Sequence, residues 1–208
     1  MVCSSDYEIC LGDGLNLCVA LEGGLSCRHG YVAKGPEDLK EEFRDYVEKL
    51  VKPYYAAVVS WYENMRIGIQ GKDIYNMIQE IFPKEEYGWT LNPGHLGSNE
   101  EWQSSPFYPG SENKICSGMI LQMDIIPQVG RYNGPNTEDG ICIADALLRR
   151  ELEEKYPDVY ARMQARRDYM INVIGVQLPE EVLPMSNLAG AFRPYMMNLD
   201  MGMKVAGE

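Results

Sequence analysis

The sequence predicts an α+β fold in which a largely antiparallel sheet is flanked by helices. Three observations predict this class. Short apolar strand candidates separated by glycine turns occupy the first 35 residues. Apolar residues then recur at helical spacing over residues 36–81 and again over residues 146–173. Strand candidates return between these two helical regions, without the strict β-α-β alternation that is typical of a parallel sheet.

The first half of the chain predicts a hairpin followed by helices. Residues 15–21 and 25–32 are the two strand candidates of the hairpin, and residues 23–24 are the glycine turn between them. Helical spacing begins after Pro36, a residue that the first helical turn tolerates. We expect Pro53 to kink or restart this helix. A shorter helix is predicted over residues 73–81, before Pro83.

The second half of the chain opens with a stretch rich in glycine and proline, residues 84–114, and loops of this length are usually functional. Strands are predicted over residues 119–126 and 141–144, and helices over residues 146–155 and 157–173. The tail from residue 178 is expected to be a closing segment packed by its apolar residues. We expect Arg162, Arg166 and Arg167 to form a solvated or ion-paired helix face.

The charge of the chain excludes several classes of partner. It carries 31 Asp and Glu against 19 Lys and Arg, a net charge of −12. Nucleic acids and anionic membranes need basic side chains to neutralise phosphate, so neither is an expected partner. The apolar runs are too short to span a membrane, and no leader sequence is evident at Met1. We therefore expect a cytoplasmic protein whose six cysteines are reduced and mostly buried.

Three residues of the second half are the strongest candidates for chemistry. His95 lies in a glycine-rich loop, Asp124 lies in an apolar strand, and Glu138 precedes an apolar strand together with Asp139. An imidazole and carboxylates on adjacent strands suit a metal site with oxygen and nitrogen ligands, or an acid–base pair. The alternatives are a hydrogen-bonded loop histidine, a core aspartate that accepts backbone N–H groups, and turn-capping carboxylates.

Aromatic residues cluster in sequence around these candidates. They either wall a pocket for a small or proline-like substrate or pack in the core, and core packing is the favoured interpretation. The cluster consists of Trp89, Trp102, Phe107, Tyr108 and Tyr132.

Three motifs, in order, resemble those of the pita-bread hydrolases, the family of methionine aminopeptidase, Xaa-Pro aminopeptidase, prolidase and creatinase. The resemblance covers roughly residues 10–145 and is closest to the branch of Xaa-Pro aminopeptidase and creatinase. The motifs are the Gly-His-x-Gly loop of residues 94–97, the Gly-Met strand of residues 118–127, and the Thr-Glu-Asp-Gly strand of residues 137–143.

The resemblance implies a metal-dependent site that this chain retains only in part. His95 and Glu138 match two metal ligands of the family, and Asp124 stands where the family has a Glu. The two ligand Asp of the family's hairpin match Leu25 and a position near Leu17 or Cys18. With these replacements we expect no metal or a single divalent ion (Mn, Co or Zn) on His95, Asp124 and Glu138, rather than a pair of ions.

Two further positions bear on the implied chemistry. The family's second active-site His matches Trp102, with Glu100 and Glu101 as neighbours rather than equivalents. Creatinase hydrolyses a C–N bond without metal, and His29 is the only candidate here for its early histidine, although a surface histidine is the simpler interpretation.

The resemblance therefore implies a pita-bread fold and a divergent hydrolase that acts on a peptide or amide C–N bond. Glu138 would be the base or a ligand, His95 a ligand or the carbonyl polariser, and Asp124 the second carboxylate. We expect residues 1–208 to form one partial domain that begins late, lacks the family's N-terminal domain, exposes apolar surface and forms a homodimer. The alternative is a non-catalytic homologue that keeps the fold for binding or assembly.

Overall fold

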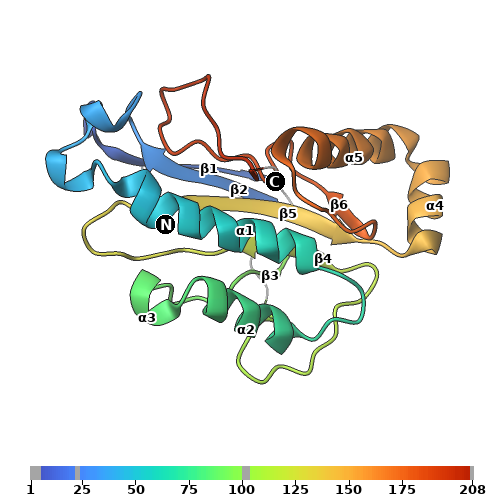
Figure 1. Cartoon of the computed structure of the whole chain (residues 1–208). Helices are drawn as coiled ribbons and strands as arrows, with labels where there is room; N and C mark the ends of the chain where they lie inside the picture. The colour runs from blue at the N-terminus through green and yellow to red at the C-terminus, as the bar shows by residue number, and fades with distance from the viewer. Residues whose placement is uncertain (1–5, 22–23, 100–103, 207–208) are drawn as a thin grey trace.

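A computed structural model describes residues 6–21, 24–99 and 104–206. Within these residues, six strands form one antiparallel sheet in the order β1-β2-β5-β4-β3, and β6 also pairs with β5 (Figure 1). The predicted hairpin is confirmed, although Gly23 of its expected turn lies outside the described residues. The strands are β1 (Gly14–Leu21), β2 (Gly24–Tyr31), β3 (His95–Leu96), β4 (Ile120–Asp124), β5 (Asn136–Ile143) and β6 (Val182–Pro184).

The helices follow the predicted order. Pro53 lies in the first turn of α1, so the α-helix restarts there after a π-helical turn at Val47–Val51. Short 3₁₀ turns at Pro36–Asp38 and Glu41–Phe43 replace the first part of the expected helix. The α-helices are α1 (Lys52–Asn64), α2 (Gly71–Ile81), α3 (Lys84–Tyr87), α4 (Ala146–Lys155) and α5 (Pro157–Tyr169), and a π-helical turn at Met170–Ile174 continues α5.

Helix α1 runs along the sheet and fixes one face of β5 (Figure 1). The backbone N–H of Thr137 donates a hydrogen bond of 2.8 Å to the hydroxyl of Tyr54. The charges of Asp139 and Arg28 act on Tyr62 of the same helix, and successive strand residues point to opposite faces, so Thr137 and Asp139 face the helix, whereas Glu138 faces away from it. The sheet therefore has a helix-covered face, which holds most of the apolar core, and an opposite face that carries Glu138.

Strand β5 begins five residues before its predicted start at Ile141. Glu138 and Asp139 therefore lie inside a strand, and the interpretation of these carboxylates as turn caps is wrong. The run Asn136-Thr137-Glu138-Asp139 lacks the apolar residues by which strands are recognised in a sequence, yet all four side chains are buried.

Two arginines of α5 also differ from expectation. Arg167 is buried and donates to the carbonyls of Pro179 and Val182, while Arg166 donates to the carbonyl of Met185. These two guanidinium groups satisfy the backbone of the closing segment, rather than forming a solvated or ion-paired face.

The cysteines are less buried than predicted. Among the described cysteines, all of which are free thiols, Cys10, Cys18 and Cys116 are exposed, Cys142 is half-buried and Cys27 is buried.

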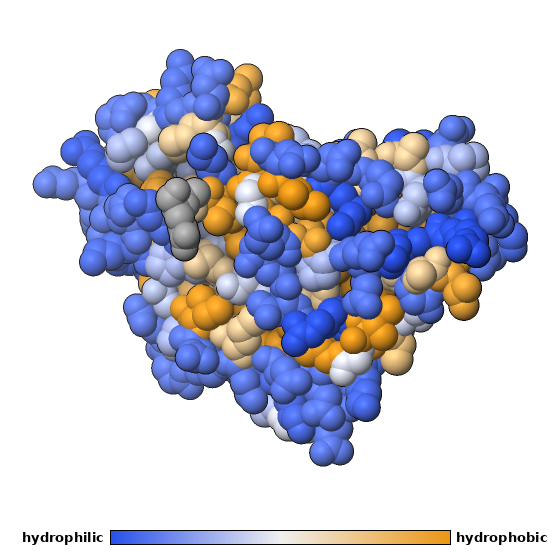
Figure 2. Space-filling view, turned by 45° about the vertical axis from the view of Figure 1, so that its right-hand side comes forward, coloured by the Kyte–Doolittle hydropathy of each residue, from blue (hydrophilic) through white to orange (hydrophobic). Residues whose placement is uncertain are grey.

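Apolar side chains are exposed along the edge strand β1, as expected. Leu17, Val19 and Leu21 are each more than half exposed on the same face of this strand. Figure 2 shows further groups of apolar residues between hydrophilic ones on the face that it presents. No helix within the described ranges is long and apolar enough to cross a membrane.

Candidate functional site

Three strands bring His95, Asp124 and Glu138 together. Asp124 of β4 is directly opposite Glu138 of β5, and His95 of β3 is opposite Gln122, two residues before Asp124. Residues two apart in a strand share a face, so all three side chains lie on the face of the sheet away from α1. One ligand atom from each residue lies within 4.8 Å of the other two, and the three residues are only 4–6% exposed.

The loop before β3 holds His95 in place through its backbone. Gly94 has a positive φ of 102°, a conformation that favours glycine, and a Cβ there would lie 2.6 Å from the carbonyl oxygen of Gln122. The carbonyl of Pro93 accepts a hydrogen bond from Trp61 Nε1, and that of Gly94 accepts one from Ser105 Oγ. The Gly-His motif therefore lets the loop approach β4 closely.

The tautomer of His95 suits a ligand. Its Nδ1 lies 2.9 Å from the carbonyl oxygen of Leu96, which can only accept, so Nδ1 carries a proton. In the neutral ring the lone pair is then on Nε2, which lies 3.3 Å from Glu138 Oε1.

The electrostatics of the site favour a positive charge at Nε2. Burial lowers the pKa of His95, but the hydrogen bonds to Glu138 and Leu96 and the charges of Asp124 and Glu138 outweigh it and raise the pKa above its ordinary value. Either a proton on Nε2 of His95 or a bound cation can supply this positive charge.

Gln122 is a site residue that the sequence did not single out. Its Nε2 donates to Glu138 Oε1 at 3.3 Å and to the carbonyl oxygen of Leu25 at 3.0 Å. It therefore links the candidate carboxylate to the hairpin strand. The available signal was its spacing, because Gln122 lies two residues before Asp124 and so shares its face.

The hairpin presents no ligand carboxylate where the family pattern places two. Leu25 lies on the site's face of β2, and its contribution is the carbonyl oxygen that binds Gln122. Cys18 and Cys27 lie opposite one another in the hairpin, and Cys27 lies opposite Glu138. Asp13 accepts the backbone N–H of Cys10 and so belongs to the turn before β1.

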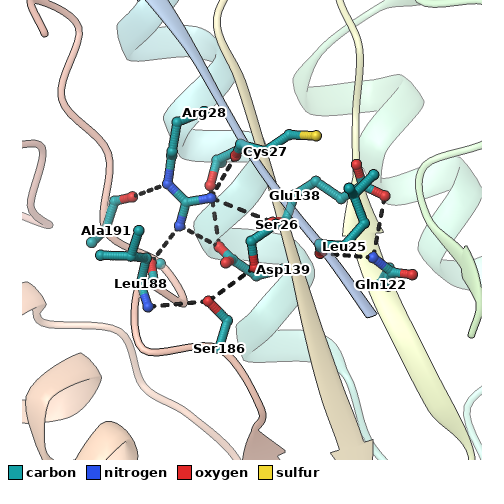
Figure 3. A network of polar contacts seen from close by, with 12 residues as sticks. Leu25, Ser26, Cys27, Arg28, Gln122, Glu138, Asp139, Ser186, Leu188 and Ala191 are labelled. Atoms are coloured by element: carbon teal, nitrogen blue, oxygen red, sulfur yellow. Dashed lines mark hydrogen bonds and ion pairs between the residues drawn. The ribbon is translucent and has the colours of Figure 1, made fainter. Parts of the chain in front are cut away.

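His29 and Asp139 are not part of the triad: His29 shares the triad's face of the sheet, two residues from Cys27, whereas Asp139 lies on the other face. His29 is half-buried on β2 opposite Asn136, rather than fully exposed. Asp139 follows Glu138 in sequence but points to the other face, where Arg28 Nη2 lies 2.7 Å from its Oδ2. Figure 3 shows Arg28 and Asp139 on one side of the two strands, and Glu138 with Gln122 on the other.

The aromatic cluster is mainly part of the core, which confirms the favoured interpretation. Trp89, Phe107 and Tyr132 are buried in the main core, and Tyr108 is exposed. Trp102, Glu100 and Glu101 lie outside the described residues.

The donor set of the triad fits one divalent ion. One imidazole nitrogen and two carboxylates are ligands that Zn²⁺, Mn²⁺ and related ions accept, and two carboxylates balance one double positive charge. The fixed Nδ1–H of His95 and the amide donor of Gln122 orient the ligands from outside, as partners of metal ligands commonly do.

Comparisons with known proteins identify the fold. No family model and no curated protein matches the chain. The prolidase from Pyrococcus horikoshii OT3 is 21% identical with a TM-score of 0.53, over 68% of this chain and 40% of that one. A recombinant prolidase from Thermococcus sibiricus is 20% identical with a TM-score of 0.51, over 70% of this chain and 39% of that one.

A third solved structure agrees with these two. Dipeptidase PepE from Mycobacterium ulcerans is 16% identical with a TM-score of 0.50, over 67% of this chain and 38% of that one. The matches thus cover about two fifths of the length of these relatives. Their shared architecture confirms what the order of the three motifs predicted: this chain has the pita-bread fold of the prolidases and aminopeptidases.

Proposed function

We propose that this protein is a divergent hydrolase that cleaves a peptide or amide C–N bond with one divalent ion held by His95, Asp124 and Glu138. The observation that supports it is the convergence of three buried ligand atoms within 4.8 Å of one another, from three neighbouring strands. A buried cluster with two carboxylates is costly unless a cation or hydrogen bonds compensate it.

A divalent ion bound at these residues would act as a Lewis acid on the carbonyl group of the substrate. His95 would contribute Nε2, since Leu96 holds the proton on Nδ1. Asp124 would contribute charge and a ligand oxygen. Glu138 would use one carboxylate oxygen as a ligand, while its Oε1, which Gln122 orients, accepts a proton from the attacking water.

A single ion suits this chain better than a pair. Two ions carry four positive charges, whereas Asp124 and Glu138 supply two negative ones. Leu25 and Cys18 stand where the family pattern has carboxylates, so the hairpin supplies no further carboxylate at these positions. Several anionic ligands are needed to hold two neighbouring dications, so the second ion has too little compensation.

We propose a small peptide, with Xaa-Pro peptides first, as the substrate class. The support is the fold shared with structures named prolidase and dipeptidase. We further propose a homodimer, because β1 is an edge strand with exposed apolar residues that a second copy of the chain can cover.

The test measures binding and turnover separately. Metal analysis and calorimetric titration with Mn²⁺, Co²⁺ and Zn²⁺ should give one ion per chain, and an Xaa-Pro peptide panel should show metal-stimulated cleavage. Glu138→Gln should abolish cleavage and weaken binding about tenfold or more. The matched control Glu112→Gln, on an exposed residue, should change neither. A protein without metal and without turnover contradicts the proposal.

A non-catalytic homologue is the second candidate, and two observations favour it. The triad residues are only 4–6% exposed, so a substrate reaches them only if the surrounding chain moves. The hairpin also offers Leu25 where the family pattern has a ligand. Stoichiometric metal binding without cleavage of any peptide in the panel would support this candidate and exclude the hydrolase.

A further inference from the structure

Four chemically reactive side chains form a row across the sheet. Cys18 of β1 is directly opposite Cys27 of β2, Cys27 is opposite Glu138 of β5, and Glu138 is opposite Asp124 of β4. Residues that are directly opposite in antiparallel strands share a face. Two thiols therefore extend the candidate site on the same face, toward the edge of the sheet.

The two thiols are close enough to bond. Directly opposite residues in antiparallel strands have Cα atoms about 4.5 or 5.5 Å apart. Disulfides bridge Cα separations of about 4.4–6.8 Å, so neither strand needs to move far.

The two cysteines differ in their access to solvent. Cys18 is exposed on the edge strand, and its Sγ lies 3.4 Å from Asn16 Oδ1. Cys27 is only 3% exposed, and Figure 3 shows its sulfur on the same side of the strands as Glu138. An accessible thiol beside a buried one is the arrangement of an attacking cysteine with a resolving cysteine.

We propose that Cys18 and Cys27 form a dithiol site that reacts with small-molecule disulfides. In the first step the Cys18 sulfur attacks a disulfide RSSR, forms a Cys18–SR bond and releases one RSH, which takes the cysteine proton. In the second step the Cys27 sulfur attacks the Cys18 sulfur, displaces the second RSH and leaves a Cys18–Cys27 disulfide. Two electrons pass from the cysteines to RSSR, which is the oxidant.

Glutathione disulfide is the probe that tests this site in the folded chain of 208 residues. After acid quenching and alkylation of free thiols, peptide mapping by mass spectrometry should find a Cys18–Cys27 disulfide. Exposed Cys116, whose sulfur contacts the carbonyl of Lys114, serves as the internal reference and should retain glutathione. The mixed disulfide at Cys18 should stay below about one tenth of that at Cys116, because its resolution is intramolecular.

Two variants separate this mechanism from simple thiol exposure. In Cys27→Ser the mixed disulfide at Cys18 should become as abundant as that at Cys116. In Cys18→Ser, a change on an exposed position that leaves the core intact, Cys27 should remain a free thiol. Equal mixed disulfides at Cys18 and Cys116 in the unchanged protein would overturn the proposal, as would pairing of Cys18 with a cysteine other than Cys27.

Discussion

Arg28 Nη2 lies 2.7 Å from Asp139 Oδ2, and this ion pair between a partly buried guanidinium and a fully buried carboxylate joins β2 to β5 on the helix-covered face. The same guanidinium donates to the carbonyls of Leu188 and Ala191, so it also ties the C-terminal segment to the sheet. Figure 3 shows these contacts on the side of the strands away from Glu138. The pair therefore holds the strand that carries Glu138 without taking part in the candidate site.

Breaking this pair should destabilise the protein strongly. Arg28→Met leaves the Asp139 carboxylate buried without its cation, and we expect a loss of about 3–5 kcal/mol in the free energy of unfolding. The double variant Arg28→Met with Asp139→Leu should lose less than the sum of the single changes, because neither charge is then left alone. Urea unfolding of the four proteins measures the coupling.

The exposed pair of Arg131 and Asp45 is the control for this cycle. Its two side chains are 53% and 43% exposed, so solvent screens the interaction, and Arg131→Met should change stability little. Equal losses in the free energy of unfolding for Arg28→Met and Arg131→Met would contradict the claim that burial of Asp139 makes its ion pair the more important one.

Sequence patterns predicted the elements whose residues repeat regularly. The hairpin, α2, α4 and α5 follow apolar periodicity and helix-boundary signals, and they were predicted within a few residues. The start of β5 was missed because Asn136 to Asp139 are polar. Their burial depends on Arg28, Tyr54 and Gln122 from distant segments, and such pairing has no local pattern.

The candidate triad was predictable from motif order, but its surroundings were not. His95, Asp124 and Glu138 each follow a recognisable motif, whereas Gln122 becomes a partner of Glu138 only through the register of β4 and β5. The separation of Glu138 from Asp139 was deducible in principle. It required recognising a strand there, since neighbouring strand residues face opposite ways.

Tyr54 should stabilise the protein through a hydrogen bond that its neighbour Tyr62 lacks. The Tyr54 hydroxyl accepts the N–H of Thr137, so Tyr54→Phe leaves a buried donor unsatisfied and should cost about 1–3 kcal/mol. The hydroxyl of Tyr62 is buried with no hydrogen-bond partner among the described residues. Tyr62→Phe should therefore be neutral or stabilising, and chemical denaturation of both variants gives the comparison. A larger loss for Tyr62→Phe would refute this assignment.

Gly94 should be required for both its backbone conformation and its closeness to β4. Gly94→Ala places a Cβ 2.6 Å from Gln122 O, at a φ of 102°. Gly110 also has a positive φ, of 75°, but a Cβ there meets nothing within 4 Å. Gly110→Ala should cost about 1 kcal/mol from backbone strain alone, and Gly94→Ala should cost clearly more.

The comparison of Gly94→Ala with Gly110→Ala also tests metal binding at the candidate site. Because Gly94 precedes His95, its replacement should also weaken divalent-ion binding measured by calorimetry, whereas Gly110→Ala should leave binding unchanged. Equal effects of the two alanines on stability would show that the approach of residue 94 to Gln122 is not tight.

The two histidines should give the metal-free protein opposite dependences of stability on pH. Hydrogen bonds and nearby carboxylates raise the pKa of His95 above the 6.5 of an unperturbed histidine. Its stabilising contribution is therefore complete below pH 6.5 and is lost as the pH rises through the raised value. Burial lowers the pKa of His29, so this residue penalises the fold at pH values below 6.5 and ceases to do so as the pH rises.

Urea unfolding in EDTA at about pH 5.5 and pH 8.5 tests both signs. The stability of the unchanged protein relative to His95→Gln should fall between the lower and the higher pH, because protonated His95 interacts with Glu138 and Asp124. Relative to His29→Gln it should rise over the same interval. The same sign for both variants would mean that His95 is not held in its charged form by the two carboxylates, which would remove the electrostatic reason for a cation at this site.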